Sequence, residues 1–186
     1  MVTKLILTFQ VIVMASTFGQ AESRNKQPLR VVASIDLSRY AGQWYEIARL
    51  PNRFEKKCTG DVMATYSVLK GNQIKVVNQC RKSNGEMSSV EGRARLAERD
   101  GPNTKLKVRF APSFLSFLPF VWGDYWIIEL APDYSYAVIG EPKRKYLWIL
   151  SRTPQMDAAK IQELANRAAA QGYDVSRLIK TKQSID

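Results

Sequence analysis

Histidine is absent from the sequence, and cysteine occurs only twice among its 186 residues. Because histidine is the commonest general base and metal ligand in proteins, its absence removes most hydrolase and zinc-enzyme mechanisms. The usual axial ligand of haem is missing as well, so haem would need a tyrosine or cysteine ligand. We therefore expect no catalytic residues, no metal site and no cofactor.

A long hydrophobic segment is also missing, because the apolar run near the amino terminus covers only residues 5–18. A membrane-spanning helix needs about 20 such residues. The run follows Lys4 and precedes Gly19-Gln20-Ala21, which together form the three-part pattern of a secretory signal peptide. We predict cleavage after Ala21 and export, to the periplasm or the outer-membrane periphery in a bacterium and by secretion otherwise. No cysteine adjoins the predicted cut, so a lipobox-type lipid anchor has no attachment atom there.

Acidic residues are few relative to basic ones, with 17 Asp and Glu against 28 Lys and Arg and a formal net charge of +11. Nucleic acid, an anionic membrane or an anionic ligand could each exploit this charge. Export argues against nucleic acid. A nucleic-acid binder would also carry exposed aromatics along a basic stripe, whereas the aromatics here fall on inward strand positions or in one apolar loop. We expect no nucleic-acid partner.

The chain between Trp44 and Leu150 consists of short segments separated by turn residues. In the clearest of them, Leu106, Val108 and Phe110 alternate with basic residues, which is the pattern of a strand. We predict eight strands, at 43–51, 61–69, 73–80, 86–97, 104–111, 124–130, 135–140 and 146–151. This spacing predicts an all-β sandwich or barrel.

One helix is expected after the last strand, and a single domain accounts for the chain. The helix is predicted by four residues that share one face, with Gly172 placed to end it: Ile161, Leu164, Ala165 and Ala168. The expected organisation is a signal peptide at 1–21, a lead-in segment at 22–33, the barrel with its helix at 34–180 and a tail at 181–186.

Three motifs occur in order along this pattern. Gly42-Gln43-Trp44-Tyr45 opens the first predicted strand, Asp133-Tyr134 precedes the seventh, and Ser151-Arg152-Thr153-Pro154 follows the eighth. They resemble the three signatures of the lipocalin family, and the wider strings at 44–49 and 146–154 resemble its bacterial lipocalin and apolipoprotein D-like branch. The resemblance covers about residues 31–180. It implies an eight-stranded antiparallel up-and-down barrel with the C-terminal helix packed outside.

The resemblance also implies a function. Members of that branch typically bind fatty acids or lysophospholipids, and the bacterial ones are often outer-membrane lipoproteins. We therefore expect a non-catalytic protein that binds, stores or transports one such ligand in the barrel cavity, for example in membrane maintenance. The missing lipobox cysteine is a departure from the bacterial members.

The two ends of such a barrel can be assigned from strand direction. Trp44 begins the first strand and Arg152 follows the eighth, so both lie at the same, closed end. An arginine stacked on an indole contributes about 0.5–2 kcal/mol and would plug the barrel there. We assign a structural role to Gly42, Trp44 and Arg152.

Alternation along the strands then predicts the inner face. With Trp44 inward, Glu46, Ala48 and Leu50 also point inward and Arg49 points outward. Small inward residues such as Gly92 would leave volume for one ligand. Glu46 and Glu129 are unusual inward residues, which would pair with a base or point outward if the register slips. The predicted cavity residues are Trp44, Ala48, Leu50, Tyr66, Val76, Asn78, Val90, Phe110, Tyr125 and Trp148.

The links that follow odd-numbered strands should meet at the open mouth. One of them is apolar and contains Phe114, Phe117, Leu118, Phe120 and Trp122. The other three are basic and contain Arg53, Lys56, Lys57, Arg81, Lys82, Lys143, Arg144 and Lys145. The apolar link is either a lid over the cavity or a membrane contact. Neighbouring cations would favour an anionic membrane by about 1 kcal/mol each, unless they form only a solvated rim.

Both cysteines also fall at the open end. In an exported protein we expect Cys58 and Cys80 to form a disulfide, which would stabilise the fold by roughly 3 kcal/mol. The alternative is a lipocalin-fold enzyme of the isomerase kind, in which one of them is a reactive thiol. Counting free thiols separates the two hypotheses.

Overall fold

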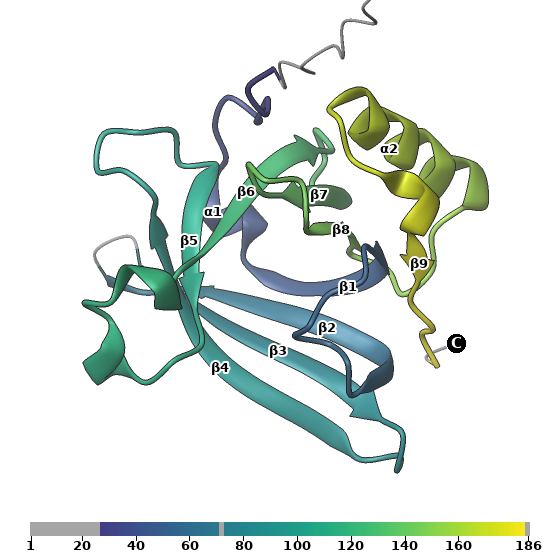
Figure 1. Ribbon diagram of the computed structural model, residues 1–186, viewed down its shortest axis with the longest axis horizontal. Coiled ribbons are helices and arrows are strands. Elements are labelled where there is room, and N and C mark those ends of the chain that lie inside the picture. Colours follow the sequence, from purple (N-terminus) through teal and green to yellow (C-terminus); the bar gives the residue numbers. More distant parts are fainter. Residues whose placement is uncertain (1–26, 71–72, 185–186) are drawn as a thin grey trace, which may run out of the picture.

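The computed structural model describes residues 27–70 and 73–184 (Figure 1). The predicted signal peptide and residues 22–26 of the predicted lead-in segment lie outside the described residues. Eight strands follow one another in the order predicted, with ends that differ by a few residues. They are β1 (Gly42–Arg49), β2 (Cys58–Val68), β3 (Ile74–Lys82), β4 (Met87–Leu96), β5 (Lys105–Arg109), β6 (Gly123–Leu130), β7 (Tyr136–Gly140) and β8 (Leu147–Ser151).

Short helices and one more strand complete the described chain. The helix α1 (Leu37–Tyr40) precedes β1, and α2 (Ala158–Ala170) follows β8. Three single 3-10 turns, η2 (Ser113–Leu115), η3 (Pro119–Val121) and η4 (Val175–Arg177), lie in links, and β9 (Ile179–Lys180) is the last strand. Within the described residues, no helix is long and apolar enough to cross a membrane.

The sheet closes on itself as an antiparallel barrel. Each strand from β2 to β7 pairs with the next one along the chain, and β1 closes the barrel by pairing with both β2 and β8. Gly42 lies opposite Tyr66 of β2, and Tyr45 lies opposite Ser151 of β8. The up-and-down barrel predicted from the sequence is therefore confirmed.

The C-terminal segment is built into the barrel wall. β1 pairs with β2 only from Gly42 to Tyr45, and beyond that point β9 takes the place of β2 along β1. On the other side, the carbonyl of Lys182 accepts from the amide of Asp61 at 2.8 Å. The side-chain amide of Gln183 donates to the carbonyls of Glu46 and Val62, on β1 and β2. Residues 181–184, expected as a tail, thus fill the gap where β1 and β2 diverge.

Two apolar clusters lie on opposite faces of the wall. The inner cluster occupies the closed half of the barrel and includes Trp44, Tyr66, Ile127 and Ile139. The outer cluster joins the wall to α2, which packs against the outside of the barrel as predicted (Figure 1). Asp157 begins α2 by accepting hydrogen bonds from the amides of residues 159 and 160.

Bulges in β1 and β6 overturn part of the predicted inner face. The pairing of β1 with β8 slips by one residue between Glu46 and Ala48, and such an insertion moves the following side chains to the opposite face. Ala48 and Leu50, predicted for the cavity, therefore pack in the outer cluster, and Arg49 points inward instead of outward.

The slip in β6 lies between Ile127 and Glu129. As a result, Glu129 points outward and forms an ion pair with Arg167 of α2 at 3.3 Å. The prediction that Glu129 faces the cavity was wrong for the same reason as that for Ala48 and Leu50.

Candidate functional site

The closed end of the barrel is sealed by Arg152. Its guanidinium lies 3.9 Å from the centre of the Trp44 ring and donates to the carbonyls of Gln43 and Arg39 at 2.8 and 2.6 Å. The Trp44 indole donates to the carbonyl of Tyr40 at 2.8 Å. Gly42 adopts a φ of 95°, and a Cβ there would lie 3.3 Å from Arg152 Nη1. A larger residue at position 42 would therefore be strained and would crowd the seal.

A group of three tyrosines lies just above this seal. The hydroxyl of Tyr125 is 2.7 Å from that of Tyr40 and 2.8 Å from that of Tyr66. Burial raises the pKa of Tyr66 to about 12 and those of Tyr40 and Tyr125 well above their ordinary value, so all three stay neutral near pH 7. Tyr40 was not predicted, because it lies in α1, outside the strands that alternation can place.

The remaining predicted cavity residues occupy different depths of the barrel. Trp44, Tyr66 and Val76 are buried in the inner cluster, and Tyr125 and Trp148 pack against it. Higher up, Asn78 lies opposite Ala64 on one side and Val90 on the other. The side-chain oxygen of Asn78 is buried without a hydrogen-bond partner. A buried acceptor of this kind destabilises the folded protein unless a water molecule or a ligand donates a hydrogen bond to it.

The upper part of the wall is open between β4 and β5. These strands pair only where residues 93–96 face residues 106–109, so Val90 lies beyond the pairing and is 46% exposed. Phe110, 39% exposed, covers Gly92, where a Cβ would lie 2.6 Å from the Phe110 ring. The expectation that Gly92 leaves empty volume was wrong, because the Phe110 ring already occupies it.

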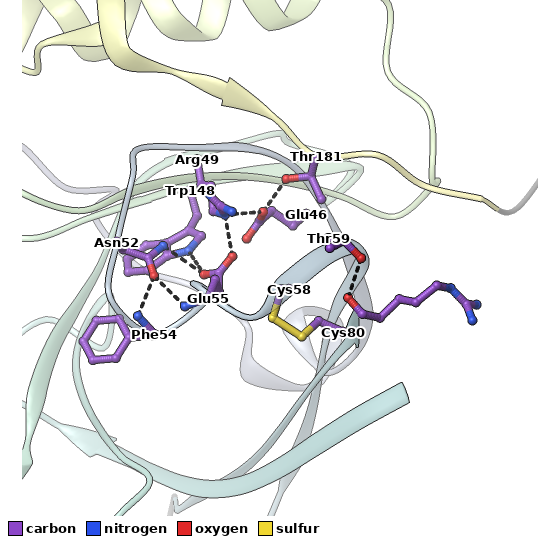
Figure 2. The surroundings of a disulfide bond; sticks show 11 residues. Glu46, Arg49, Asn52, Phe54, Glu55, Cys58, Thr59, Cys80, Trp148 and Thr181 are labelled. Carbon is purple, nitrogen blue, oxygen red and sulfur yellow. Dashed lines mark hydrogen bonds and ion pairs between the residues drawn. A yellow bond between two sulfur atoms is a disulfide. The ribbon is translucent and has the colours of Figure 1, made fainter. Parts of the chain in front are cut away.

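A charged cluster lies inside the open half, and we call Glu46, Arg49, Glu55 and Trp148 the Arg49 cluster (Figure 2). Arg49 Nε is 2.6 Å from a carboxylate oxygen of Glu55 and 3.2 Å from one of Glu46. The Trp148 indole donates to Glu55 at 2.9 Å, and the hydroxyl of Thr181 donates to Glu46. Burial, together with the neighbouring Glu55 carboxylate, raises the pKa of Glu46 well above its ordinary value.

The disulfide predicted between Cys58 and Cys80 is confirmed. It joins the start of β2 to the end of β3, with the two Cα atoms 5.6 Å apart, and lies beside the Arg49 cluster (Figure 2). Both cysteines of the chain are used, so neither is a free thiol. The isomerase alternative therefore lacks its nucleophile.

The predicted basic residues of the mouth fall into two groups: those that are engaged in ion pairs or hydrogen bonds within the protein, and those that are exposed. Arg81 pairs with Asp61 at 2.5 Å and Lys82 with Glu86 at 3.5 Å. Arg144 donates to three backbone carbonyls, which belong to Gln27, Pro142 and Gln171. It therefore fastens the β7–β8 link to neighbouring segments and is not a free cation. The exposed members are Arg53, Lys56, Lys57, Lys143 and Lys145.

Two pockets lie beside the mouth. One of about 360 Å³ is lined by Lys56, Lys57, Thr59, Lys82, Ser83 and Asn84. The other has about 510 Å³ and lies between the β1–β2 link, the β7–β8 link and η4. It is lined by Leu50, Pro51, Asn52, Arg53, Lys56, Arg144, Lys145, Tyr146, Asp174 and Arg177. Leu50 is the single predicted cavity residue in either pocket, so both are basic surface pockets outside the barrel.

The apolar link between β5 and β6 projects into solvent, at the lower left of Figure 1. Phe114, Phe117 and Phe120 are 74%, 76% and 80% exposed, whereas Leu118 is half-buried. The guanidiniums of Arg95 and Arg109 both contact the Trp122 ring, 4.2 and 5.2 Å from its centre. Arg95 and Arg109 belong to the outer face of the barrel, because the intervening side chains of β4 and β5 form the inner cluster. Rings so exposed do not cover the cavity in this structure.

The sequence is similar to those of several known proteins. The family model described as "Lipocalin-like domain" matches residues 35–183. Temperature-induced lipocalin-1 of Arabidopsis thaliana is 45% identical over 160 residues, which cover 86% of this chain and 85% of that protein. Outer membrane lipoprotein Blc of Escherichia coli K12 is 39% identical over 156 residues, 82% of each chain. Apolipoprotein D of Rattus norvegicus is 31% identical over 190 residues, 97% of this chain and 94% of the relative.

Solved structures give the same fold. Insecticyanin from the tobacco hornworm Manduca sexta superposes with a TM-score of 0.63 at 23% identity, over 85% of this chain and 86% of that one. At this level of identity the likeness concerns the fold alone. The family model and the relatives go further: this chain belongs to the lipocalins, a family known for binding small hydrophobic ligands, and to the branch that includes the Blc lipoproteins and apolipoprotein D.

Proposed function

We propose that this protein binds one single-chain lipid, a fatty acid or a lysophospholipid, inside the barrel and carries it without changing it chemically. The observation that supports this most directly is the contrast along the inner face. The closed half is packed, whereas the open half exposes Val90 and Phe110 and leaves the buried oxygen of Asn78 without a partner. A ligand that enters from the mouth would cover Val90 and Phe110. It would also donate a hydrogen bond to the Asn78 oxygen or displace water from it.

The energy of such binding would come from the acyl chain. Each CH₂ that leaves water contributes about 0.8 kcal/mol. The chain would run toward the three tyrosines, whose neutral hydroxyls are already bonded to one another, and it would stop there because the inner cluster is filled below them. The polar head would stay among the Arg49 cluster and the basic links.

Export and membrane contact complete the proposal. Relatives of this chain include outer membrane lipoproteins and apolipoprotein D, and we infer that this protein is exported too. Phe117 and Phe120 project from the β5–β6 link, while Lys56, Lys57 and Lys143 are exposed on other links of the same barrel end. We infer peripheral contact with an anionic membrane, in which the rings insert and the lysines meet lipid phosphates. Co-sedimentation with anionic and neutral vesicles tests this part.

Lipid titration followed by tryptophan fluorescence tests the central proposal. Oleate or lysophosphatidylcholine at micromolar concentration should change the emission, because Trp148 lies inside the open half. Trp148→Ala should weaken binding at least several-fold and leave the barrel folded. Trp122→Ala is the matched control, since that ring lies on the outer surface and its loss should leave affinity unchanged. Failure of the wild-type protein to bind either lipid would contradict the proposed function.

A further inference from the structure

We propose that Arg49 receives the carboxylate of a bound fatty acid, and that Glu55 holds this place in the empty barrel. The inference deepens the proposed function and rests on it, because it names the residue that selects the head group. Nothing in the alternation of the sequence suggests it, since the alternation places Arg49 on the outside. The bulge in β1 brings it in.

Arg49 is a largely buried cation whose charge must be balanced. Its side chain is 14% exposed, and its register partner on β8 is Trp148, which points into the barrel. A buried guanidinium without a carboxylate would be strongly destabilising. Two carboxylates, those of Glu46 and Glu55, lie within 3.2 Å of Arg49 Nε (Figure 2). One of them is enough to neutralise it.

Glu46 and Glu55 are attached to different parts of the molecule. Glu46 belongs to the wall, 2% exposed, with its backbone carbonyl and its carboxylate both bonded to the C-terminal segment. Burial and the charge of Glu55 raise the pKa of Glu46, which favours its neutral form. Glu55 is also the nearer partner of Arg49, at 2.6 Å against 3.2 Å for Glu46, and it comes from a link and not from a strand.

The Glu55 side chain can turn out of the cluster without breaking the sheet, because it belongs to a link whose backbone Asn52 holds in place. Asn52 organises this link, since its side-chain oxygen accepts from the amides of Phe54 and Glu55. On either side of Glu55, Phe54, Lys56 and Lys57 are exposed. Three side chains of other types hold the Glu55 carboxylate inside the barrel, namely Arg49, Asn52 and Trp148, and the Glu46 carboxyl interacts with it as well.

Those three side chains form a receptor for a carboxylate. Arg49 supplies a guanidinium, and Asn52 and Trp148 each supply an N–H within 3.0 Å of Glu55. The carboxylate of a fatty acid can accept the same hydrogen bonds when Glu55 leaves. The exchange of one carboxylate for another keeps the number of buried charges constant, while the acyl chain adds buried apolar surface. A fatty alcohol offers the same chain without the charge and cannot displace Glu55 in this way.

Equilibrium binding of oleate and oleyl alcohol to the full chain tests the assignment. The ratio of the two dissociation constants reports the carboxylate alone, because the alkyl chains are the same. Arg49→Gln should weaken oleate binding by about 10- to 100-fold, as expected for loss of one partner of a buried ion pair, and leave oleyl alcohol unchanged. Arg93→Gln is the matched control: Arg93 pairs with Glu91 on the outer face of β4, and the ratio should stay at the wild-type value.

Removal of the competing carboxylates should have the opposite effect. Once Glu55 is neutral, Glu46 can ionise and take over Arg49, so the decisive variant is the double change Glu46→Gln with Glu55→Gln. We expect its affinity for oleate to rise about tenfold, with oleyl alcohol unaffected. If this variant does not fold, the Arg49→Gln comparison still decides the question.

Carbon-13 NMR of carboxyl-labelled oleate gives a second readout. Bound to the wild-type protein, the label should keep the chemical shift of an ionised carboxylate from pH 8 to pH 5, because Arg49 stabilises the charge. In Arg49→Gln the label should titrate within that range. An unchanged binding ratio in Arg49→Gln, or a label that titrates alike in both proteins, overturns the assignment and leaves the carrier function intact. No binding of either probe by the wild-type protein overturns both.

Discussion

The closed and open halves of the barrel are built from the same strands and yet are filled in different ways. In the closed half Trp44, Ile127 and Ile139 have no exposed surface, and the Trp44 indole has its hydrogen bond. In the open half Val90 and Phe110 are exposed and an ion pair lies where an apolar core would continue. The closed half therefore specifies the fold, whereas the open half leaves surface uncovered, and this is the part to which we assign the proposed ligand and membrane contacts.

The largest expected effect comes from breaking the closed half. Trp44→Ala removes a fully buried ring and the surface on which Arg152 stacks, so the free energy of unfolding should fall by about 3–5 kcal/mol. Urea denaturation followed by circular dichroism measures this. Trp122→Ala, on the outer surface of the open half, should cost much less. Equal losses in the two variants would show that the halves do not differ in this way.

The disulfide is expected to have the next largest effect, and its local part should be felt in the open half. Changing both cysteines to serine should lower the free energy of unfolding by about 2–4 kcal/mol, because the bridge restricts the unfolded chain. Hydrogen exchange around Trp44 should accelerate only as far as this global loss requires, whereas the link at residues 51–57, which ends at Cys58, should open locally and exchange faster still. Link amides that are no faster than the global loss requires would argue that the disulfide has no local role in the open half.

A smaller effect is expected from Glu46, and its sign depends on pH. The raised pKa means that the folded protein holds a proton that the unfolded chain releases above its ordinary pKa of 4.5. Glu46 therefore contributes stability below about pH 4.5, and that contribution is lost as the pH rises toward the folded value. Glu46→Gln keeps the neutral form at every pH, so its Tm should exceed that of the wild type by about 2–4 °C at pH 8 and match it near pH 4.

Arg49 and Glu55 both face Glu46, so their influence on the pH profile of stability needs its own measurement. In a Glu55→Gln background, Glu46 can pair with Arg49 as an ion, and the advantage of Glu46→Gln at pH 8 should disappear. A Glu46→Gln curve parallel to the wild-type curve at all pH values would mean that Glu46 is ionised in the folded protein.

The same contrast explains what could be predicted from the sequence. The eight strands were predictable because turn residues separate them and because alternation is local. The closed end was predictable because antiparallel strands fix which ends meet: Trp44 and Arg152 had to lie together. The disulfide followed from export and from the same direction argument.

The inner face of the open half could not be predicted, because one inserted residue reverses every side chain after it. A hint existed in β1: Ile47, Ala48 and Leu50 are all apolar, and a helix-covered outer face requires apolar residues there. Nothing comparable marked Arg144, whose φ of 57° and three carbonyl partners depend on segments far away in the sequence. The sequence shows that residue 144 is positively charged, but it does not show that the guanidinium holds the β7–β8 link in place.

The smallest expected effect on stability belongs to the β5–β6 link, and it separates the function of the open half from its folding. Phe117→Ser combined with Phe120→Ser should change the free energy of unfolding by no more than about 0.5 kcal/mol, because both rings are already in water.

The same variant should lose the binding to anionic vesicles that survives high salt, since that part would come from insertion of the rings. Charge reversal at Lys143 and Lys145, which are exposed, should remove the part that weakens with salt, because screening acts over about 8 Å at physiological ionic strength. A link that served as a lid would give the opposite result: the double phenylalanine variant would release its lipid faster and bind vesicles as the wild type does. If the wild-type protein does not bind anionic vesicles even at low salt, the proposed membrane contact of the open half is wrong.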